Sequence, residues 1–484
     1  QTEVEGERIM LSEILMKNLG VRGLCDDSRR VKSGDLFFSM PVIDYDVFAR
    51  DAIAAGAVAV VSESMAPAGL ASKWIQVADV KAARLEAARI FYRDPFAKLA
   101  CHAVTGTNGK TTSAFLMDAM LTASGAKVAL LGTIKNKVGN VCVPANLTTP
   151  GQLDLFAFAA KAVEAGCTDL VMETSSHALH QGRVAGVNYR SGLFSNLTQD
   201  HLDYHKTMDA YFEAKKLLFT KYLSSDGVAV INVDDAHGEL LCSELKSCGV
   251  KTVGVSRLKS PKADVKPAGY VENTEDGLKF NLEGFGAESR FETSLCGDFN
   301  VDNVMLVLSW ANAMGISKSS MDKALAEIRV PGRFEKVWNK NGIHVVVDYA
   351  HTPDALERVL ITARSLCRGK LSCIFGCGGD RDKTKRPIMG EIAERLSDKA
   401  WLTSDNPRTE NPAEIIKDVL AGMKTRKFEV VELRDEAIRR ACAELKEGDW
   451  LVVAGKGHED YQIIGKTKHH FDDREEVVKA MENV

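Results

Sequence analysis

Long uninterrupted apolar runs are missing from this chain of 484 residues, and no secretory signal pattern is visible at its start. A membrane-spanning helix needs about 20 consecutive apolar residues, so we expect no contact with a membrane. A large excess of one charge is also missing, because 62 Lys and Arg residues are balanced by 66 Asp and Glu residues. Without a general basic field the chain is not expected to bind nucleic acid, and any anionic ligand must be held by local groups.

Paired cysteine spacing is missing as well, apart from Cys373 and Cys377 among the 11 cysteines. These two thiols could hold a metal, but a strand that ends in a glycine turn fits them better. Scattered cysteines in apolar runs are typical of a reducing compartment. We therefore expect the protein to be cytoplasmic.

The length is too great for a single core, and the pattern divides the chain into three blocks. We expect a small α/β domain over 1–98, a central domain over 99–330 and a C-terminal domain over 331–484. Short apolar runs alternate with helical patterns in the last two blocks, which predicts mostly parallel sheets covered on both faces. The fold class is therefore α/β, with a P-loop ATPase-like central sheet and a Rossmann-like C-terminal domain. The runs expected as strands are 58–61, 99–104, 127–132, 168–172, 191–196, 227–232, 344–347, 371–375, 399–403 and 450–454.

The most informative segment is Thr105-Gly-Thr-Asn-Gly-Lys-Thr-Thr112, which lies between an expected strand and an expected helix. Glycines at such a junction let backbone N–H groups surround a phosphate at the positive end of the helix dipole. Lys110 could reach the outer phosphates, and the Thr111 hydroxyl could bind magnesium. The segment predicts an ATP site formed by Gly106, Thr107, Asn108, Gly109, Lys110, Thr111 and Thr112.

Glu173, His201 and one of two neighbouring lysines are further candidates for the same chemistry. Glu173 follows the expected strand 168–172, and His201 lies in the loop after 191–196, so either could bind magnesium near the phosphates. Lys215 and Lys216 lie on an expected helix, where a lysine is usually a solvated charge. A lysine beside a phosphate site that holds two metals can instead become a carbamate, which supplies an anionic oxygen ligand.

Three polar loops each follow an expected strand of the C-terminal sheet. They are 378–386, 405–408 and 455–459. Because the ends of parallel strands meet at one edge, these loops should converge. Their arginines could bind a carboxylate, and Asp405 and Glu459 could bind an ammonium group, which suits a zwitterionic amino acid.

Several motifs, in both content and order, resemble those of the Mur ligase family. The motifs are 105–112, Glu173-Thr-Ser-Ser-His177, Asn196 to His205 with Lys215, Gly297-Asp-Phe-Asn-Val-Asp-Asn303, Pro331-Gly-Arg-Phe-Glu335, Asp348-Tyr-Ala-His-Thr-Pro353 and Asp405-Asn-Pro-Arg408. The resemblance covers nearly the whole chain. It implies a monomeric ATP-dependent amide ligase of peptidoglycan synthesis that uses Mg²⁺.

The resemblance also assigns roles to individual residues. It implies that Lys215 is carbamylated and, with Thr111, Glu173 and His201, binds metal, and that Lys110, Glu173, His201 and Lys215 are catalytic. The nucleotide is expected to contact Asn303, Arg333 and Asp348. The UDP-muramyl peptide is expected at Ser28, Thr148, Thr149, Ser175, Gln181 and Arg183. The amino acid is expected at Arg381, Asp405, Asn406, Pro407, Arg408, Gly455 and Glu459.

With arginine at position 408, the chain resembles those family members that add meso-diaminopimelate to UDP-MurNAc-L-Ala-D-Glu. The resemblance implies that this arginine is the cationic partner of the second carboxylate of that amino acid. A lysine-adding ligase and a folylpolyglutamate synthetase are the alternatives within the family. A P-loop nucleotide hydrolase or kinase is the alternative outside it. The segment 40–48 departs from the family pattern, so no uridine contact is assigned to it.

Overall fold

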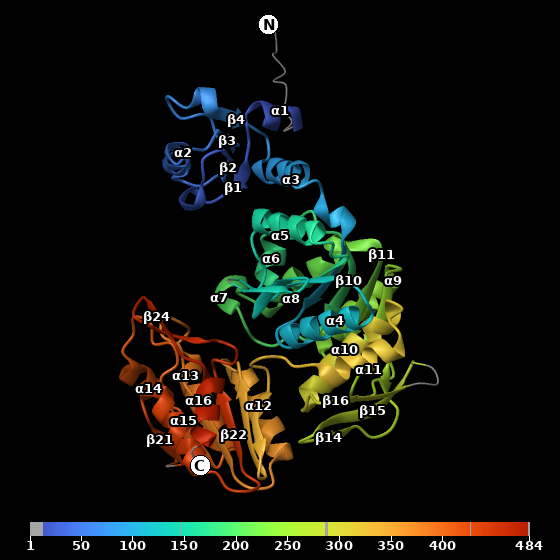
Figure 1. Ribbon diagram of the computed structural model, residues 1–484, viewed down its shortest axis with the longest axis vertical. Coiled ribbons are helices and arrows are strands. Elements are labelled where there is room, and N and C mark those ends of the chain that lie inside the picture. The colour runs from blue at the N-terminus through green and yellow to red at the C-terminus, as the bar shows by residue number, and fades with distance from the viewer. Residues whose placement is uncertain (1–12, 146, 286–288, 426, 483–484) are drawn as a thin grey trace. The chain divides into compact units, whose positions relative to one another are not determined.

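The computed structural model describes residues 13–145, 147–285, 289–425 and 427–482 (Figure 1). Its contacts divide the chain into two compact units. The first unit contains the chain up to Ala103 together with Gly125–Gly192 and Glu213–Gly227, and the second contains Val104–Ser124, Leu193–Phe212 and the chain from Val228 onward. Across the described ranges, every helix is too short or too polar to cross a membrane.

The N-terminal sheet has four parallel strands in the order β1-β2-β3-β4. The strands are β1 (Gly23–Cys25), β2 (Asp35–Ser39), β3 (Ala59–Ser62) and β4 (Trp74–Gln76), and the helices are α1 (Glu13–Asn18), α2 (Tyr45–Ala54) and α3 (Val80–Phe91). Phe37 and Val60 of the sheet pack against Ala49 and Ala52 of α2 in a small core. The Asp79 carboxylate caps α3 by accepting from the backbone N–H groups of its first turn.

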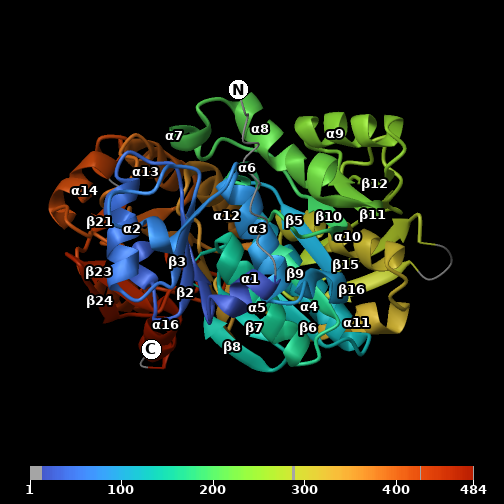
Figure 2. The same ribbon diagram turned by 90° about the horizontal axis from the view of Figure 1, so that it is seen from above.

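An eight-stranded sheet follows, in the order β12-β11-β10-β5-β9-β6-β7-β8. Its strands are β5 (Ala100–Thr105), β6 (Val128–Leu131), β7 (Lys135–Val138), β8 (Val141–Pro144), β9 (Asp169–Glu173), β10 (Tyr189–Phe194), β11 (Leu223–Asn232) and β12 (Lys251–Val255). Its helices are α4 (Lys110–Ala123), α5 (Gln152–Glu164), α6 (Ser176–His180), α7 (Leu202–His205), α8 (Met208–Leu217) and α9 (Ala236–Ser247). Figure 2 shows α9 beside β11 and β12 at one edge of the sheet. The β7–β8 hairpin at the other edge is antiparallel.

The segment between residues 266 and 293 differs from the expected alternation of strands and helices. It forms a small antiparallel sheet of β13 (Lys266–Pro267), β14 (Glu272–Thr274), β15 (Gly277–Glu283) and β16 (Arg290–Thr293). In β15, Leu278, Phe280 and Leu282 are buried and alternate with exposed residues. One face of this small sheet is therefore apolar and buried, and its burial stabilises the sheet. The helices α10 (Asp298–Ala313) and α11 (Lys318–Glu327) follow it.

The C-terminal sheet has six strands in the order β17-β18-β22-β19-β20-β21. They are β17 (Glu335–Lys340), β18 (Ile343–Asp348), β19 (Leu371–Phe375), β20 (Lys399–Leu402), β21 (Phe428–Val430) and β22 (Trp450–Ala454), and only β17 is antiparallel to its neighbour. The helices are α12 (Pro353–Leu366), α13 (Lys385–Leu396), α14 (Pro412–Leu420), α15 (Arg434–Ala443) and α16 (Asp473–Met481), and β23 (Tyr461–Ile464) and β24 (Thr467–His470) form a separate hairpin.

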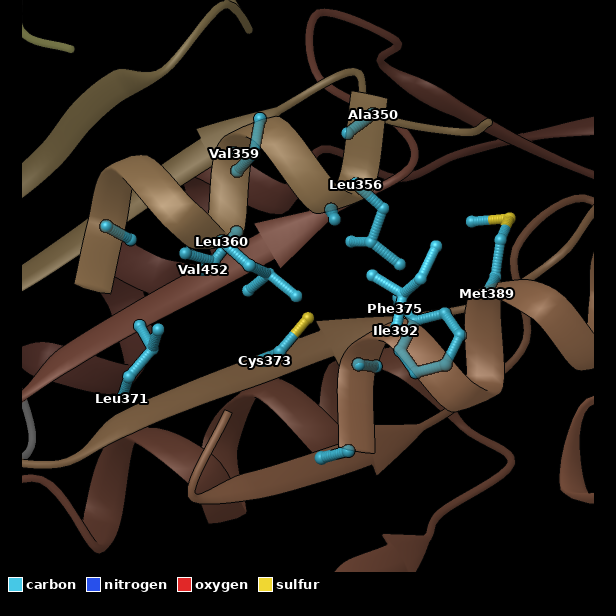
Figure 3. Packing of buried hydrophobic residues seen from close by; sticks show 14 of the residues in the cluster. Ala350, Leu356, Val359, Leu360, Leu371, Cys373, Phe375, Met389, Ile392 and Val452 are labelled. Atoms are coloured by element: carbon cyan, nitrogen blue, oxygen red, sulfur yellow. The ribbon is translucent and has the colours of Figure 1, made fainter. Parts of the chain in front are cut away.

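One face of this sheet is covered by α12, α13 and α14. Figure 3 shows Leu356 and Leu360 of α12 pointing into a buried cluster with Cys373 and Phe375 of β19. Cys377 packs on Met389, with 3.8 Å between the two sulfur atoms, so Cys373 and Cys377 belong to an apolar core. No group of three His, Cys, Asp or Glu that could hold a metal occurs among the residues that the structure describes.

The α/β class with mostly parallel sheets is confirmed, and each expected strand is present within a few residues of its predicted bounds. In the six-stranded sheet, the parallel strands β18, β19, β20 and β22 have their carboxyl ends at one rim. A polar loop follows each of them there. The domain boundaries at residues 98 and 330 stay a prediction.

Candidate active site

The phosphate loop, residues 105–112, lies between the end of β5 and the start of α4, as predicted. Gly106 and Gly109 have φ angles of 148° and 86°, which disfavour any other residue. A Cβ on Gly106 would overlap the hydroxyl of Ser195, and one on Gly109 would overlap the amide of Asn303. The Lys110 ammonium curls back over the loop and donates to the carbonyl oxygens of Gly106 and Thr107, at 2.9 and 2.7 Å.

The segment that follows β10 holds the phosphate loop in place through hydrogen bonds to Asn108. The side-chain oxygen of Asn196 accepts from the backbone N–H of Asn108 at 2.9 Å, and its amide nitrogen donates to the carbonyl of Asn108 at 3.2 Å. The Ser195 hydroxyl donates to the same carbonyl at 2.6 Å. Asn196 belongs to one of the motifs but has no role predicted from it, and the structure shows that it fixes the loop backbone.

Arg333 and Asp348 lie at the start of the C-terminal sheet, within the same compact unit as the phosphate loop. The Arg333 guanidinium donates to the Thr111 hydroxyl at 3.3 Å and stacks 4.5 Å above the ring of Tyr349. The Asp348 carboxylate accepts from the backbone N–H groups of Phe334 and Ala350, at 2.6 and 2.8 Å. Burial raises the pKa of Asp348 to about 6, although Arg333 opposes this shift.

Glu173 is fully buried at the end of β9, in the other unit. Its two carboxylate oxygens accept from the backbone N–H and the hydroxyl of Thr133, at 2.7 and 3.0 Å. The Thr133 hydroxyl also lies 3.0 Å from that of Thr148. Thr133 was missed by the sequence analysis because a threonine after a strand carries no signal of its own.

The predicted muramyl-peptide residues are partly brought together around Thr149. The Thr149 hydroxyl donates to the backbone carbonyl of Glu173 at 2.8 Å and accepts from the backbone N–H of Ser175 at 3.0 Å. Arg183 donates to the Thr149 carbonyl at 3.3 Å and to the side chain of Gln181 at 2.8 Å. Ser28 begins a short 3₁₀ helix beside β1, and none of the hydrogen bonds described for this unit joins it to these residues.

Burial separates the two candidate lysines of α8. Lys215 is 1% exposed, whereas the side chain of Lys216 is 21% exposed and lies 3.6 Å from the carboxylate of Glu213. His201 has a left-handed φ of 54°, and its ring contacts Tyr211, whose hydroxyl is 3.2 Å from that of Thr107. The buried lysine is therefore the better candidate for modification, while the His201 segment approaches the phosphate loop through a tyrosine.

At the rim of the six-stranded sheet, the loops after β20 and β22 are joined as predicted. The Asn406 amide donates to Glu459 at 2.9 Å, and the fully buried Lys456 ammonium lies 3.2 Å from the same carboxylate. Asp405 is also buried, and a Cβ on Gly455 would lie 2.6 Å from its carboxylate. Lys456, which the sequence analysis left without a role, thus offsets the charge of Glu459.

The two predicted arginines of this rim differ in how they are held. Arg408 has a left-handed φ of 53°, and its guanidinium donates to the carbonyl of Gly379 at 2.8 Å. Arg381 is exposed, with a bond of 3.1 Å to the carbonyl of the residue before it. Pro407 lies between Asn406 and Arg408, and its carbonyl accepts from the backbone N–H of Glu410. The fixed Arg408 side chain and the exposed Arg381 side chain both offer the planar fork that binds a carboxylate.

Two family models match the chain: the Mur ligase middle domain over residues 104–311 and the Mur ligase glutamate ligase domain over 332–457. The chain belongs to the Mur ligase family. It is 44% identical to a UDP-N-acetylmuramoyl-L-alanyl-D-glutamate–2,6-diaminopimelate ligase of Geobacter metallireducens, with 96% of this chain and 94% of that protein covered. An identically named ligase of Bacillus cereus is 42% identical, with 94% and 93% covered.

Solved structures agree with this assignment. A structure of a UDP-N-acetylmuramoyl-L-alanyl-D-glutamate–2,6-diaminopimelate ligase superposes with a TM-score of 0.68 at 35% identity, and covers 96% of this chain and 95% of that one. MurF from Acinetobacter baumannii has a TM-score of 0.64 at 17% identity, with 98% of this chain and all of that one covered, and this likeness concerns the fold alone.

Proposed function

We propose that this chain is an ATP-dependent ligase that joins meso-diaminopimelate to the D-Glu side-chain carboxylate of UDP-MurNAc-L-Ala-D-Glu. The observation that carries the proposal is the pairing, in one family fold, of a phosphate loop with a rim of fixed acid and arginine side chains. The relatives described above are named for this reaction, which supports the choice of amino acid.

In the first step, a carboxylate oxygen of D-Glu attacks the γ-phosphorus of ATP, the bond to the β-phosphate oxygen breaks, and ADP leaves. The loop N–H groups and Lys110 bind the phosphates, and Arg333, which reaches Thr111 in the structure, adds a second cation. Such fixed charges lower the barrier because two anions must approach each other. Asn303 lies against Gly109 and Asp348 holds the backbone beside Arg333, and these contacts support the proposal that both residues belong to the nucleotide site.

Magnesium fits the oxygen donors that the chain offers, because a hydroxyl and a buried carboxylate are hard ligands and this ion is usually completed by phosphates and water. We propose that Thr111, Glu173, His201 and a carbamate on Lys215 would hold it. When bound, magnesium offsets the negative charge of the triphosphate. The burial of Lys215 supports its choice as the modified residue, because the neighbouring Lys216 is partly exposed, as a solvated helix lysine usually is.

The first step leaves an acyl phosphate on D-Glu. In the second step, the neutral amine of meso-diaminopimelate attacks the carbonyl carbon of this acyl phosphate, the bond from that carbon to the phosphate oxygen breaks, inorganic phosphate leaves, and the nitrogen gives up one proton to form the amide. In this proposal Asp405 and Glu459 hold the ammonium of the amino acid and Arg408 and Arg381 bind its carboxylates, with Asn406, Pro407 and Gly455 shaping the loops between them. The muramyl peptide is proposed to lie along Thr148, Thr149, Ser175, Gln181 and Arg183, with its uridine toward Ser28.

We also propose that the protein acts in the cytoplasm as a monomer. All eleven cysteines are free thiols, which supports a reducing compartment.

The test is phosphate release from ATP by the purified chain with UDP-MurNAc-L-Ala-D-Glu and one amino acid at a time. We expect release only when both acceptor and meso-diaminopimelate are present, with a new amide product by mass spectrometry. Preferred use of L-lysine would replace the proposed amino acid. Full-rate ATP hydrolysis without the acceptor would indicate a nucleotide hydrolase and overturn the ligase assignment.

A further inference from the structure

Asp354, the second residue of α12, makes a contact that none of the expected roles explains. Its Oδ2 accepts from the side-chain amide of Asn108 at 2.8 Å and from the Thr198 hydroxyl at 3.3 Å. Asn108 lies in the middle of the phosphate loop, 246 positions away in the sequence. An acidic residue in the first turn of a helix is already stabilised by the helix dipole. The helix itself therefore does not explain why Asp354 also contacts the phosphate loop.

The carboxylate is rigidly placed. Thr352 caps α12 through the backbone N–H of Ala355, and Pro353 fits the first helical turn. Leu356 and Leu360, on the following turns, are buried in the core of the C-terminal sheet (Figure 3). Since the helix cannot shift without disturbing that core, Asp354 offers the loop a fixed acceptor.

The charge of Asp354 is also balanced. The Arg358 side chain donates from Nε to both carboxylate oxygens at 3.0 Å, one helical turn along α12. Without this partner, a carboxylate bound to the phosphate loop would repel the triphosphate. The pair therefore supplies a strong acceptor to Asn108 at little electrostatic cost to an anionic ligand.

We infer that Asp354 is a positioning residue for the nucleotide, which acts through Asn108 to hold the phosphate loop in its binding conformation. The loop is then fixed on both sides of Asn108. Asn196 holds its backbone from the β10 side, and Asp354 holds its side chain from α12. A preformed loop binds phosphate more tightly because less of the binding energy is used to order it.

This inference rests on the proposed binding of ATP, and the experiment separates the two. Affinity for ADP and for a non-hydrolysable ATP analogue, each with magnesium, is measured by calorimetry on the full chain. The variants are Asp354→Ala, Asn108→Ala and the double variant. If the wild-type chain binds neither nucleotide, the proposed function fails before the variants are compared.

We expect Asp354→Ala to weaken nucleotide binding about 10-fold, the usual effect of losing a hydrogen bond to a charged group. In the Asn108→Ala background the same change should add less than about 2-fold, because the 2.8 Å contact with Asn108 is already lost and only the longer 3.3 Å bond from Thr198 remains. Asp354→Asn keeps an acceptor oxygen and should recover part of the affinity. The KM for ATP should rise in the Asp354→Ala enzyme while the KM for the amino acid stays unchanged.

Glu357→Ala is the matched control, because Glu357 lies on the same helix and its carboxylate is bonded to Arg395 instead. It should bind nucleotide as the wild type does. Unchanged affinity in Asp354→Ala, or a full 10-fold loss that persists in the Asn108→Ala background, would overturn the inference. A merely structural role for Asp354 would give that second, additive result.

Discussion

Gly378 leaves the space that the Arg408 guanidinium occupies: a Cβ on this glycine would lie 2.9 Å from Nη1 of Arg408. The φ angle of Gly378 lies outside the left-handed region, so an alanine there meets no backbone strain. The single close neighbour is the tip of a side chain, which can move. Arg408 in turn is fixed by its bond to the Gly379 carbonyl. The glycine therefore sets where the guanidinium can lie.

From this relationship we predict that Gly378→Ala displaces the Arg408 guanidinium without unfolding the protein. If Arg408 binds the second carboxylate of meso-diaminopimelate, the KM for that amino acid should rise roughly 10-fold, since a hydrogen bond to a charged group is weakened. The KM for ATP should stay within about 2-fold of the wild type. Steady-state kinetics with each substrate varied in turn measures both values, and an unchanged KM for diaminopimelate would contradict the role of Arg408.

The buried lysine of α8 gives a second prediction. Lys215→Ala should lower turnover by roughly 100-fold or more, because the proposed carbamate is a metal ligand and even supporting ligands change activity by 10- to 100-fold. Short carboxylates added to the assay should restore part of the activity. Lys216→Ala is the matched control, because that side chain is partly exposed beside Glu213. Equal activity of the two variants would argue against a special role for Lys215.

A third prediction concerns stability at the end of β22. Arg434 and Asp473 form a fully buried pair with two bonds of 2.7 Å, and Arg434 also donates to the carbonyl of Ala454. Asp473→Ala leaves a buried cation without its partner, so the free energy of unfolding should fall by about 3–5 kcal/mol. Replacing both residues, as Arg434→Met with Asp473→Leu, should cost clearly less. Urea unfolding followed by circular dichroism compares the variants, and equal losses would show that the charge pair is not the cause.

The fourth prediction is a pH dependence that Asp348 causes. Its pKa is about 6 in the folded chain and 3.8 for the ordinary group, so between these values the folded state binds more protons. Stability contributed by the protonated form is therefore complete below about pH 4 and is lost as the pH rises through 6. Asp348→Asn cannot titrate, so the unfolding midpoint of the wild type should fall relative to that of the variant between pH 4 and 7. Parallel pH profiles of the two proteins would contradict the raised pKa.

Local sequence was enough to predict ten of the parallel strands and the phosphate loop, whereas the parallel strands β1, β2, β4, β12 and β21 were not among the expected runs. A run such as Trp450–Ala454 is apolar because both faces of a parallel strand are covered, and the glycines around Lys110 mark the turn directly. The antiparallel strand β15 also carries a readable signal, because Leu278, Phe280 and Leu282 alternate with polar residues. The expected alternation of parallel strands with helices is therefore wrong for this segment.

Contacts between distant segments could not be predicted in the same way. Nothing near Asp354 indicates that its carboxylate meets Asn108, because both residues are ordinary for their local positions. Lys456 and Thr133 are similar cases, since each becomes important only through the carboxylate, of Glu459 or Glu173, that folding brings to it. The sites of the proposed muramyl peptide and amino acid followed from family resemblance, and the roles of those residues stay predictions.

Arg333, just before β17, and Asp354, on α12, both bond to the phosphate loop. The loops assigned to the amino acid come instead from the turns after β19, β20 and β22 of the same sheet. The residues that contact the phosphate loop and the loops assigned to the amino acid therefore lie in separate segments of the sequence within one domain. Grafting the loops 378–386 and 405–408 from a relative with another preference should therefore redirect the enzyme's choice of monomer while its use of ATP is retained.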